Sequence, residues 1–405
     1  MYSINEIRRC LLLLATKKKL SPNDHNLVRG DIAMKKKLNP NYHKRLRGEA
    51  SKSWSDLPFD LLNLVFERLS FADFQRAKSV CSSWRSSSRQ CVPKNHIPWV
   101  LRFPQNNENS SCMLFNPEEK DKLYKTQDLG LEFAKSSCMK TYGSWLLMQN
   151  LQSNLFIVNL FTGERINLPP VESQFGMTKI QSPVFWIDEK TKDHVVSWAR
   201  SKKCVVYSKT GDNSWNKIPK SSGCLDMVYK DHKLYFSSYS GKVKIFDFSG
   251  EIPQQIVIEE KHIVPPLVIL KPIDYSVHWP SIDATNIVVT VTGDVLKVVK
   301  VWTYWSRSWS FRLYKVYSLG FKQHEQVYSL GDEAMLLDLG ITVLANDNDG
   351  IRRNSIYFSD CKNTNKVFHF SFETRKMERL HKFDCSSVQL SSSQWFLPSN
   401  SLRHD

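Results

Sequence analysis

Side chains that could act as nucleophiles, proton carriers or metal ligands occur throughout this chain, but their spacing assembles no reactive site. No two of the nine cysteines form a Cys-x-x-Cys pair, and the 11 histidines form no His-x₃₋₅-His pair. The sequence also lacks a Gly-x-Ser-x-Gly elbow, a His-Glu-x-x-His motif and a Gly-rich phosphate loop. We therefore expect reduced, mostly buried thiols, no catalytic residue, no metal site and no cofactor.

One loop carries the kind of oxygen ligands that divalent cations prefer. Its residues are Asn346, Asp347, Asn348, Asp349 and Gly350, which favour a tight, oxygen-rich turn. The loop lacks a glutamate at the downstream spacing of a calcium loop. A plain surface turn is therefore the favoured interpretation.

A third candidate site combines aromatic and basic residues and has the composition of a stacking platform for nucleic acid. Alternation of aromatic residues at 302–304 and at 309–311 instead favours a hairpin with one aromatic face in the protein core. A subset could still form a substrate pocket, because aromatic and arginine side chains dominate binding hot spots. The segment consists of Lys300, Trp302, Tyr304, Trp305, Arg307, Trp309, Phe311, Arg312, Tyr314, Lys315 and Tyr317.

The positive charge of the chain is concentrated near its start. The 405 residues contain 56 Lys and Arg against 40 Asp and Glu, a net charge of +16. Residues 1–50 hold 12 of the bases and four of the acids, so half of the net charge lies in one eighth of the chain. We expect residues 1–50 to form a flexible basic tail, because no apolar period offsets the entropy of ordering them.

Two basic clusters in this tail have the composition of a nuclear import signal, and a solvated tail or a non-specific contact with polyanions is the alternative. No apolar run approaches the ~18 residues that a membrane helix needs. We therefore expect a protein of the nucleus and/or cytoplasm, not secreted and without a membrane partner. The clusters are Lys35, Lys36, Lys37, Lys44, Arg45 and Arg47.

Residues 54–90 have the periodicity of short α-helices, and Pro58 suits the first helical position. The first helix has one apolar face made of Leu61, Leu62, Val65, Phe66 and Leu69. A second helix is expected after the capping-box-like Ser70 to Asp73, weakened by the serines after position 81. Its apolar positions are Phe74, Ala77, Val80, Cys81 and Trp84. Two short helices cannot bury all these side chains against each other, so some must face a partner or the domain that follows.

From about residue 100 to 398 the pattern changes to short β-rich runs separated by turn residues. Four Ser/Thr-Gly-Glu/Asp turns recur at steps of 48, 39 and 43 residues, with glycines at 163, 211, 250 and 293. A period of about 40–50 residues built from four strands is typical of a β-propeller, here of roughly six or seven blades, and a long β-sandwich is the alternative. The expected strands are Leu155–Leu160, Val195–Trp198, Cys204–Tyr207, Lys233–Ser237, Lys242–Phe248, Asn286–Val291, Val295–Trp302, Ser355–Phe358 and Lys366–Phe372.

The helical segment, over about residues 53–95, closely resembles the F-box family. It opens on Leu57-Pro58 followed by an acid, continues with paired apolar residues, and closes on Val80-Cys81-x-x-Trp84. The resemblance implies docking on a Skp-type adaptor within a cullin–RING ubiquitin ligase, and a helical cap on the β-domain is the alternative. Cys81 is expected to be an inert thiol at a packing position. The adaptor-facing or motif-core positions that the resemblance implies are Leu57, Pro58, Leu61, Leu62, Val65, Phe66, Leu69, Phe74, Val80, Cys81 and Trp84.

The β-rich segment, residues 100–398, resembles the KIB-type β-propeller that follows many plant F-boxes. The expected fold class is thus mainly β, with a small N-terminal helical F-box and a β-propeller. The residues that carry the resemblance are Val158–Glu164 with Leu168–Pro170, Val228–Tyr235, Asn354–Asp360 and Gln394–Pro398.

The two resemblances together imply a non-catalytic substrate-recognition adaptor of an SCF-type E3 ubiquitin ligase. The F-box would dock on the Skp-type adaptor, and the propeller would bind a protein substrate. One alternative is a basic nucleic-acid-associated protein of the nucleus, whose binding would weaken steeply with salt. Another is a propeller enzyme, which would need convergent titratable groups at one mouth of the channel. Nucleic acid is the less favoured partner.

Overall fold

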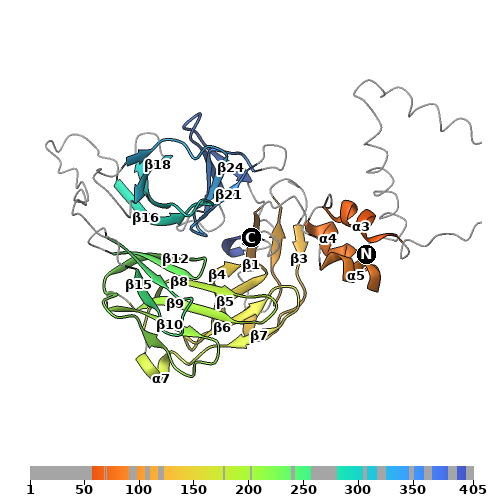
Figure 1. Ribbon diagram of the computed structural model, residues 1–405, viewed down its shortest axis with the longest axis horizontal. Coiled ribbons are helices and arrows are strands. Elements are labelled where there is room, and N and C mark those ends of the chain that lie inside the picture. The colour runs from red at the N-terminus through yellow and green to blue at the C-terminus, as the bar shows by residue number, and fades with distance from the viewer. Residues whose placement is uncertain are drawn as a thin grey trace, which may run out of the picture. The chain divides into compact units, whose positions relative to one another are not determined.

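The computed structural model divides the chain into two compact units, residues 1–95 (unit 1) and residues 96–405 (unit 2). Figure 1 shows the helices of unit 1 in orange and the later strands of unit 2 in yellow, green and blue. The predicted basic tail, its import signal and the Asn346–Gly350 loop lie outside the described residues. The structure describes residues 57–67, 69, 71–89, 91, 98–104, 110–116, 123–176, 178–200, 203–238, 242–256, 281–303, 308–316, 325–345, 351–359, 367–381 and 390–397.

The described part of unit 1 contains three short helices, α3 (Phe59–Phe66), α4 (Phe71–Ala77) and α5 (Ser82–Ser88). Helix α3 begins directly after Pro58, whose carbonyl accepts hydrogen bonds from the N–H groups of Leu61 and Leu62 at 3.1 and 3.0 Å. Pro58 therefore ends the extended chain and starts the helix without leaving an N–H group of its own unsatisfied.

The prediction of two helices in this segment is wrong, because the second apolar period is divided between α4 and α5. The chain turns after Ala77, and Cys81 caps α5 by accepting a hydrogen bond from the Trp84 N–H at 3.5 Å. The serines expected to weaken the helix lie inside α5, where Ser87 and Ser88 are buried. Burial of one helix face here overrides the modest helix propensity of serine.

Unit 2 folds into five sheets in its described part, and four of them have four antiparallel strands. The sheet β25-β1-β2-β3 contains Leu390–Phe396, Trp99–Pro104, Met113–Phe115 and Leu123–Lys125. The sheet β4–β7 contains Ser137–Tyr142, Trp145–Gln149, Leu155–Asn159 and Arg165–Asn167. The sheet β8–β11 contains Ile180–Ile187, His194–Arg200, Cys204–Lys209 and Asn216–Lys217. The sheet β12–β15 contains Cys224–Lys230, Lys233–Ser238, Val243–Asp247 and Gln254–Ile256.

The fifth sheet has nine strands in the order β19-β18-β17-β16-β21-β20-β22-β23-β24. Parallel pairing joins β16 to β21 and β20 to β22, whereas its other pairs are antiparallel. One-turn helices α6 (Leu131–Ala134) and α7 (Glu172–Phe175) precede β4 and β8. In chain order the nine strands are Ser281–Val289, Val295–Thr303, Ser308–Val316, Glu325–Val327, Glu333–Leu336, Ile341–Leu344, Ser355–Ser359, Val367–Ser371 and Met377–His381.

The sheets of unit 2 are arranged like the blades of a β-propeller. Strand β25 pairs antiparallel with β1, so that Trp99 lies opposite Phe396 and one sheet joins the two ends of the unit. The first strands of successive sheets contact one another, β25 with β4, β4 with β8, β8 with β12 and β12 with β16. The predicted mainly-β fold with a propeller-like domain is confirmed, and the number of six or seven blades stays a prediction.

The four glycine turns that suggested a repeat are not all equivalent. Gly163, Gly211 and Gly250 lie between the third and fourth strands of their sheets, whereas Gly293 lies between the first and second strands, β16 and β17. All nine predicted strands coincide with strands of the structure, with ends shifted by a few residues. Three of the turns therefore occupy the same position in successive sheets, and the fourth has a similar spacing by coincidence.

Apolar side chains that alternate along the strands fill the space between neighbouring sheets. Trp145 and Ile157 of the β4–β7 sheet pack with Val196 and Trp198 of the β8–β11 sheet in one buried cluster. A second cluster joins the β8–β11 sheet to the β12–β15 sheet and includes Val205, Tyr207, Leu234, Phe236 and Phe246. Packing in these clusters fixes the positions of the first strands of neighbouring sheets relative to one another.

Gly340 sits in the tight turn between β20 and β21, where its φ is +75°. A Cβ atom there would lie 2.3 Å from Cγ2 of Val228 and 3.2 Å from the carbonyl of Ile287. We expect Gly340→Ala to lower the free energy of unfolding by about 2–4 kcal/mol, from backbone strain and overpacking together. Gly293→Ala is the matched control, because its φ is +86° and no atom lies within 4 Å of the new Cβ. Equal losses in urea unfolding of the two variants would contradict the steric argument.

Candidate functional site

The described side chains of unit 1 separate into a buried set and an exposed set. Phe66 is fully buried at the centre, with its ring centroid 5.6 Å from that of Phe74 and 5.5 Å from that of Trp84, both edge to face. Such contacts stabilise a core beyond the area they bury. The core consists of Leu62, Phe66, Leu69, Phe74, Ala77, Trp84 and Cys91.

The sequence-predicted site residues fall on both sides of this division. Of the 11 positions, Leu62, Phe66, Leu69, Phe74 and Trp84 belong to the core. Leu57, Val65 and Cys81 are half-buried at its edge, and Pro58, Leu61 and Val80 are exposed. The structure therefore assigns the buried five to folding and leaves the other six available at the surface of unit 1.

Two exposed apolar residues of α3 were not among the predicted positions. Phe59 is 41% exposed and Leu64 is 48% exposed, close to the 49% of Leu61. Leu61 and Leu64 are three residues apart and so lie on the same side of the helix. The signal was present in the sequence, because α3 is apolar all round apart from Asp60 and Asn63, and such a helix is normally covered on every side.

The two described thiols of unit 1, Cys81 and Cys91, take part in hydrogen bonds within its fold. Cys81 caps α5, and Cys91 donates hydrogen bonds to Asn63 Oδ1 and to the carbonyl of Ser87. Burial, with a smaller contribution from Glu67, raises the pKa of the Cys91 thiol, which therefore stays protonated at neutral pH. The six described cysteines of the chain are all free.

The aromatic segment of residues 300–317 belongs mainly to the core of unit 2 in its described part. Phe311 is buried, and Trp309 packs against the same cluster, whose members include Phe358 and Phe368. Nζ of Lys300 lies 4.4 Å from the Trp309 ring centroid, and Lys315 pairs with Asp294 at 2.7 Å. The core interpretation is confirmed for Phe311. Lys300 and Lys315, two of the bases in this segment, are thus engaged within the fold.

Three charged side chains from separate elements converge where the first strands meet, and we call Lys140, Asp226 and Asp338 the inner charge cluster. Lys140 Nζ donates to the main-chain carbonyl of Asp338 at 2.6 Å. Ser359 donates to Asp338 Oδ2 through its N–H at 2.8 Å and its hydroxyl at 2.6 Å. Asp226 Oδ2 accepts from the Ile287 N–H at 2.9 Å. Lys140 and Asp226 each follow a β-bulge in the first strand of their sheets.

The inner charge cluster was not predicted from the sequence, since its members lie 86 and 112 residues apart. Burial raises the pKa values of both carboxyl groups and lowers that of Lys140, while the opposite charges act against these shifts. The cluster joins the β4–β7 sheet, the β12–β15 sheet and the nine-stranded sheet. The hydrogen bonds of Lys140, Asp226 and Asp338 link these sheets, so the cluster contributes to the structure of unit 2.

The raised pKa values of Asp226 and Asp338 give a pH dependence of known sign. In the folded state these groups hold protons to higher pH than in the unfolded chain, so they reduce stability as pH rises from about 4 through their folded pKa values. We expect Asp226→Asn to become more stable relative to the native chain as pH rises through this window, so that its free energy of unfolding minus that of the native chain increases. Asp188→Asn should show the opposite slope at lower pH, because backbone hydrogen bonds to Asp188 lower its pKa. Urea titrations between pH 3 and 7 measure both slopes.

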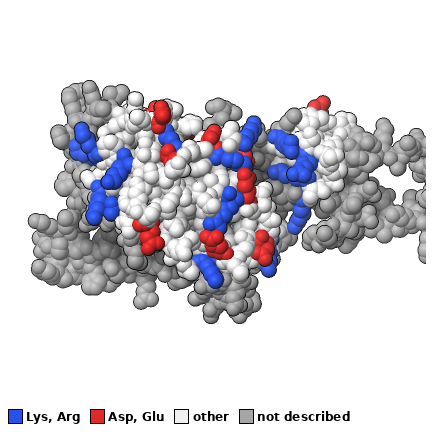
Figure 2. Space-filling view, turned by 90° about the horizontal axis from the view of Figure 1, so that it is seen from below, with Lys and Arg blue, Asp and Glu red and all other residues white. Residues whose placement is uncertain are grey.

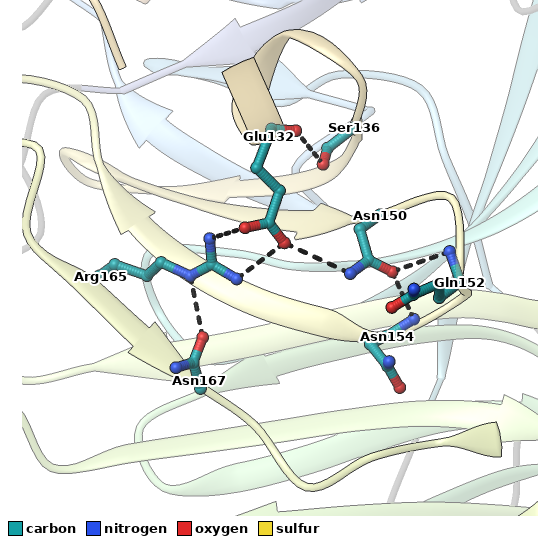
Figure 3. A network of polar contacts seen from close by, with 7 residues as sticks. All are labelled: Glu132, Ser136, Asn150, Gln152, Asn154, Arg165 and Asn167. Atoms are coloured by element: carbon teal, nitrogen blue, oxygen red, sulfur yellow. Dashed lines mark hydrogen bonds and ion pairs between the residues drawn. The ribbon is translucent and has the colours of Figure 1, made fainter. Parts of the chain in front are cut away.

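Figure 3 shows a polar network that connects α6 to the β4–β7 sheet. Glu132 accepts hydrogen bonds from both terminal nitrogens of Arg165, with Nη2 at 2.9 Å, and from Asn150 Nδ2 at 3.3 Å. Arg165 Nε also donates to Asn167 Oδ1 at 2.8 Å. The hydrogen bonds from Arg165 and Asn150 lower the pKa of Glu132. The charges of Glu132 and Arg165 compensate each other, and their hydrogen bonds connect α6, which precedes β4, to strand β7.

Charged side chains on the face shown in Figure 2 are of both signs, with basic and acidic groups interspersed over the described residues. Among the described residues, no group of three or more His, Cys, Asp or Glu is arranged to hold a metal ion. No described helix is both long enough and apolar enough to cross a membrane. The exposed apolar side chains of α3 are a candidate binding surface of unit 1.

Comparison with known proteins identifies both units. The F-box domain family matches residues 54–96, and the KIB1-4 β-propeller family matches residues 110–373. The chain named "Putative F-box protein At4g22180" of Arabidopsis thaliana is 54% identical over 392 residues, covering 87% of this chain and 95% of that relative. F-box protein At1g69090 of the same plant is 44% identical over 377 residues, covering 85% and 92%. F-box protein At2g05970 is 40% identical over 376 residues, covering 86% and 96%.

Proposed function

The chain belongs to the F-box proteins that carry a KIB1-4 β-propeller, and we propose on this premise that it is a substrate-recognition adaptor of an SCF-type (Skp–cullin–RING) E3 ubiquitin ligase. Unit 1 binds the Skp-type adaptor, and unit 2 binds a protein substrate. The observation that carries the proposal is the exposed apolar surface of α3 within the F-box match, since a small helical unit gains nothing in stability by leaving Leu61 and Leu64 in water.

In this proposed role the chain contributes no catalytic residue to ubiquitin transfer. Ubiquitin passes from the charged conjugating enzyme to a substrate lysine, and this chain contributes proximity by holding substrate and ligase in one complex. The hydrogen-bonded thiols of Cys81 and Cys91 in unit 1 are consistent with such a role. We also place the protein in the nucleus and/or cytoplasm, with Lys35–Lys37 and Lys44, Arg45 and Arg47 as its import signal.

Co-expression of the full chain with a plant Skp-type adaptor tests the proposal. We expect a stable one-to-one complex by size-exclusion chromatography, because the exposed side chains of α3 are desolvated only when a partner covers them. Adding cullin and RING subunits should then give a four-protein complex. Separate migration of the chain and of several adaptor paralogues at micromolar concentrations would contradict the assignment.

A further inference from the structure

Four aromatic side chains lie together where the first strands of three sheets of unit 2 reach their turns, and we call them the aromatic row: Tyr142, Trp186, Tyr229 and His232. Tyr142 ends β4, Trp186 precedes the β8–β9 turn, and Tyr229 and His232 flank the start of the β12–β13 turn. All three turns join the first and second strands of a sheet, so they lie on the same face of the propeller. Strand β8 contacts both β4 and β12, which places Trp186 at the middle of the row.

The row is in direct ring contact across the sheets. The ring centroids of Trp186 and His232 are 4.9 Å apart, edge to face, and those of Trp186 and Tyr229 are 6.5 Å apart. Tyr142 also contacts strand β8, because its ring centroid lies 5.9 Å from that of Phe185, which precedes Trp186. Trp186 and Tyr142 are half-buried and His232 is exposed, so the row presents aromatic surface to solvent.

Acidic side chains act on the row although the chain as a whole is basic. Burial raises the pKa of Tyr142, and the acids Asp231, Glu189 and Asp188 raise it further. Residues 188–193 and 230–233 of these turns hold four acids and four lysines, and two of the lysines are engaged within the fold. Lys192 pairs with Glu164 at 3.2 Å, and Lys230 Nζ donates to the carbonyl of Thr290, while Lys190 is exposed. The potential at the Tyr142 hydroxyl therefore favours a cation.

One polar group at the base of the row is buried. Tyr229 is 6% exposed, and its hydroxyl has no hydrogen-bond partner among the described residues. The Tyr229 ring contacts Trp186 of the row, with the ring centroids 6.5 Å apart. A buried hydroxyl left without a partner costs about 1–3 kcal/mol, and a donor that enters the row would remove this cost.

We propose that the aromatic row binds a lysine or arginine side chain of the substrate protein. The aromatic faces provide cation–π contacts, the acids at the rim attract the charge, and the Tyr229 hydroxyl accepts an N–H group of the incoming side chain. This inference rests on the proposed function, because it assigns the substrate-binding face of unit 2 and the chemistry that it recognises.

Binding of a fluorescein-labelled octa-arginine peptide to the full chain in 0.15 M salt tests the proposal by fluorescence anisotropy. We expect Trp186→Leu and Glu189→Lys each to weaken binding at least fivefold. Glu373→Lys is the matched control, because it makes the same change of net charge at another exposed hairpin turn and should alter the affinity less than twofold. Circular dichroism and thermal unfolding of each variant show whether it remains folded.

Two results would overturn the proposal: no binding of the peptide by the native chain at millimolar concentration, or equal weakening by Glu189→Lys and Glu373→Lys. Replacing Lys35, Lys36 and Lys37 by Gln should leave the affinity unchanged. A gain of fivefold or more would show that the chain's own basic segment fills the row, and would also overturn the assignment to a substrate. The same preparations are assayed for adaptor binding. Loss of peptide binding then tests the aromatic row, and loss of adaptor binding separately tests the F-box assignment.

Discussion

Replacing Leu61 by Asp is expected to abolish binding of the Skp-type adaptor to the full chain, with a loss of affinity of at least 100-fold. The side chain is 49% exposed on α3, so the substitution leaves the core of unit 1 intact. In the complex it would place an unpaired carboxylate in an apolar interface and remove the leucine contacts. The two effects together exceed the ~2.8 kcal/mol that corresponds to 100-fold. Isothermal titration calorimetry with purified adaptor measures the loss.

Two further variants separate binding from folding. Leu151→Asp makes the same chemical change at a leucine of unit 2 that is 77% exposed, and should leave adaptor affinity unchanged. Phe66→Ala should destabilise unit 1 by about 3–5 kcal/mol, because it empties the centre of the core. It therefore reduces adaptor binding through unfolding, which loss of helical circular dichroism reveals. If Leu61→Asp binds with native affinity while remaining folded, α3 does not contact the adaptor through this face.

The helical pattern alone could locate unit 1 but could not divide its residues between core and surface. Helix α3 is apolar on nearly every side, and period 3.6 identifies a buried face only when a polar face stands opposite it. Leu61 and Leu62 are adjacent in the sequence and equally apolar, yet one is half exposed and the other fully buried. The packing of Phe66 against Phe74 and Trp84 decides which face turns inward, and that packing involves residues from three helices.

In unit 2, local alternation predicted individual strands well, whereas contacts distant in sequence could not be predicted. The pairing of Trp99 with Phe396 and the parallel pairing of Val289 with Ile341 leave no periodic signal. The aromatic row depends on three turns about 40 residues apart. Tyr229 and His232 lie within the Val228–Tyr235 segment that carries the family resemblance, but the members of the row become neighbours only after the sheets pack, so the sequence did not group them.

The inner charge cluster leads to the largest stability effect that we expect in unit 2. Lys140→Met should lower the free energy of unfolding at pH 7 by about 3–5 kcal/mol, because it removes the positive charge that acts on both buried carboxyl groups and leaves Lys300 as the other base that acts on Asp338. Met is close to Lys in size and shape, so loss of charge rather than a cavity dominates. Lys244→Met is the control, since Lys244 Nζ also donates to a main-chain carbonyl, that of Lys220, and no ion pair joins it to a carboxylate among the described residues.

The origin of this cost can be separated from packing by pH and by compensation. Without Lys140 the two carboxyl groups take up protons more readily, so the destabilisation should shrink as pH falls from 7 to 5. Adding Asp226→Asn and Asp338→Asn to Lys140→Met should recover most of the loss at pH 7, because the amides keep hydrogen bonds to Ile287 and Ser359 without a net charge. A loss that is independent of pH and that persists in the triple variant would mean that the lysine stem, rather than its charge, holds the three sheets together.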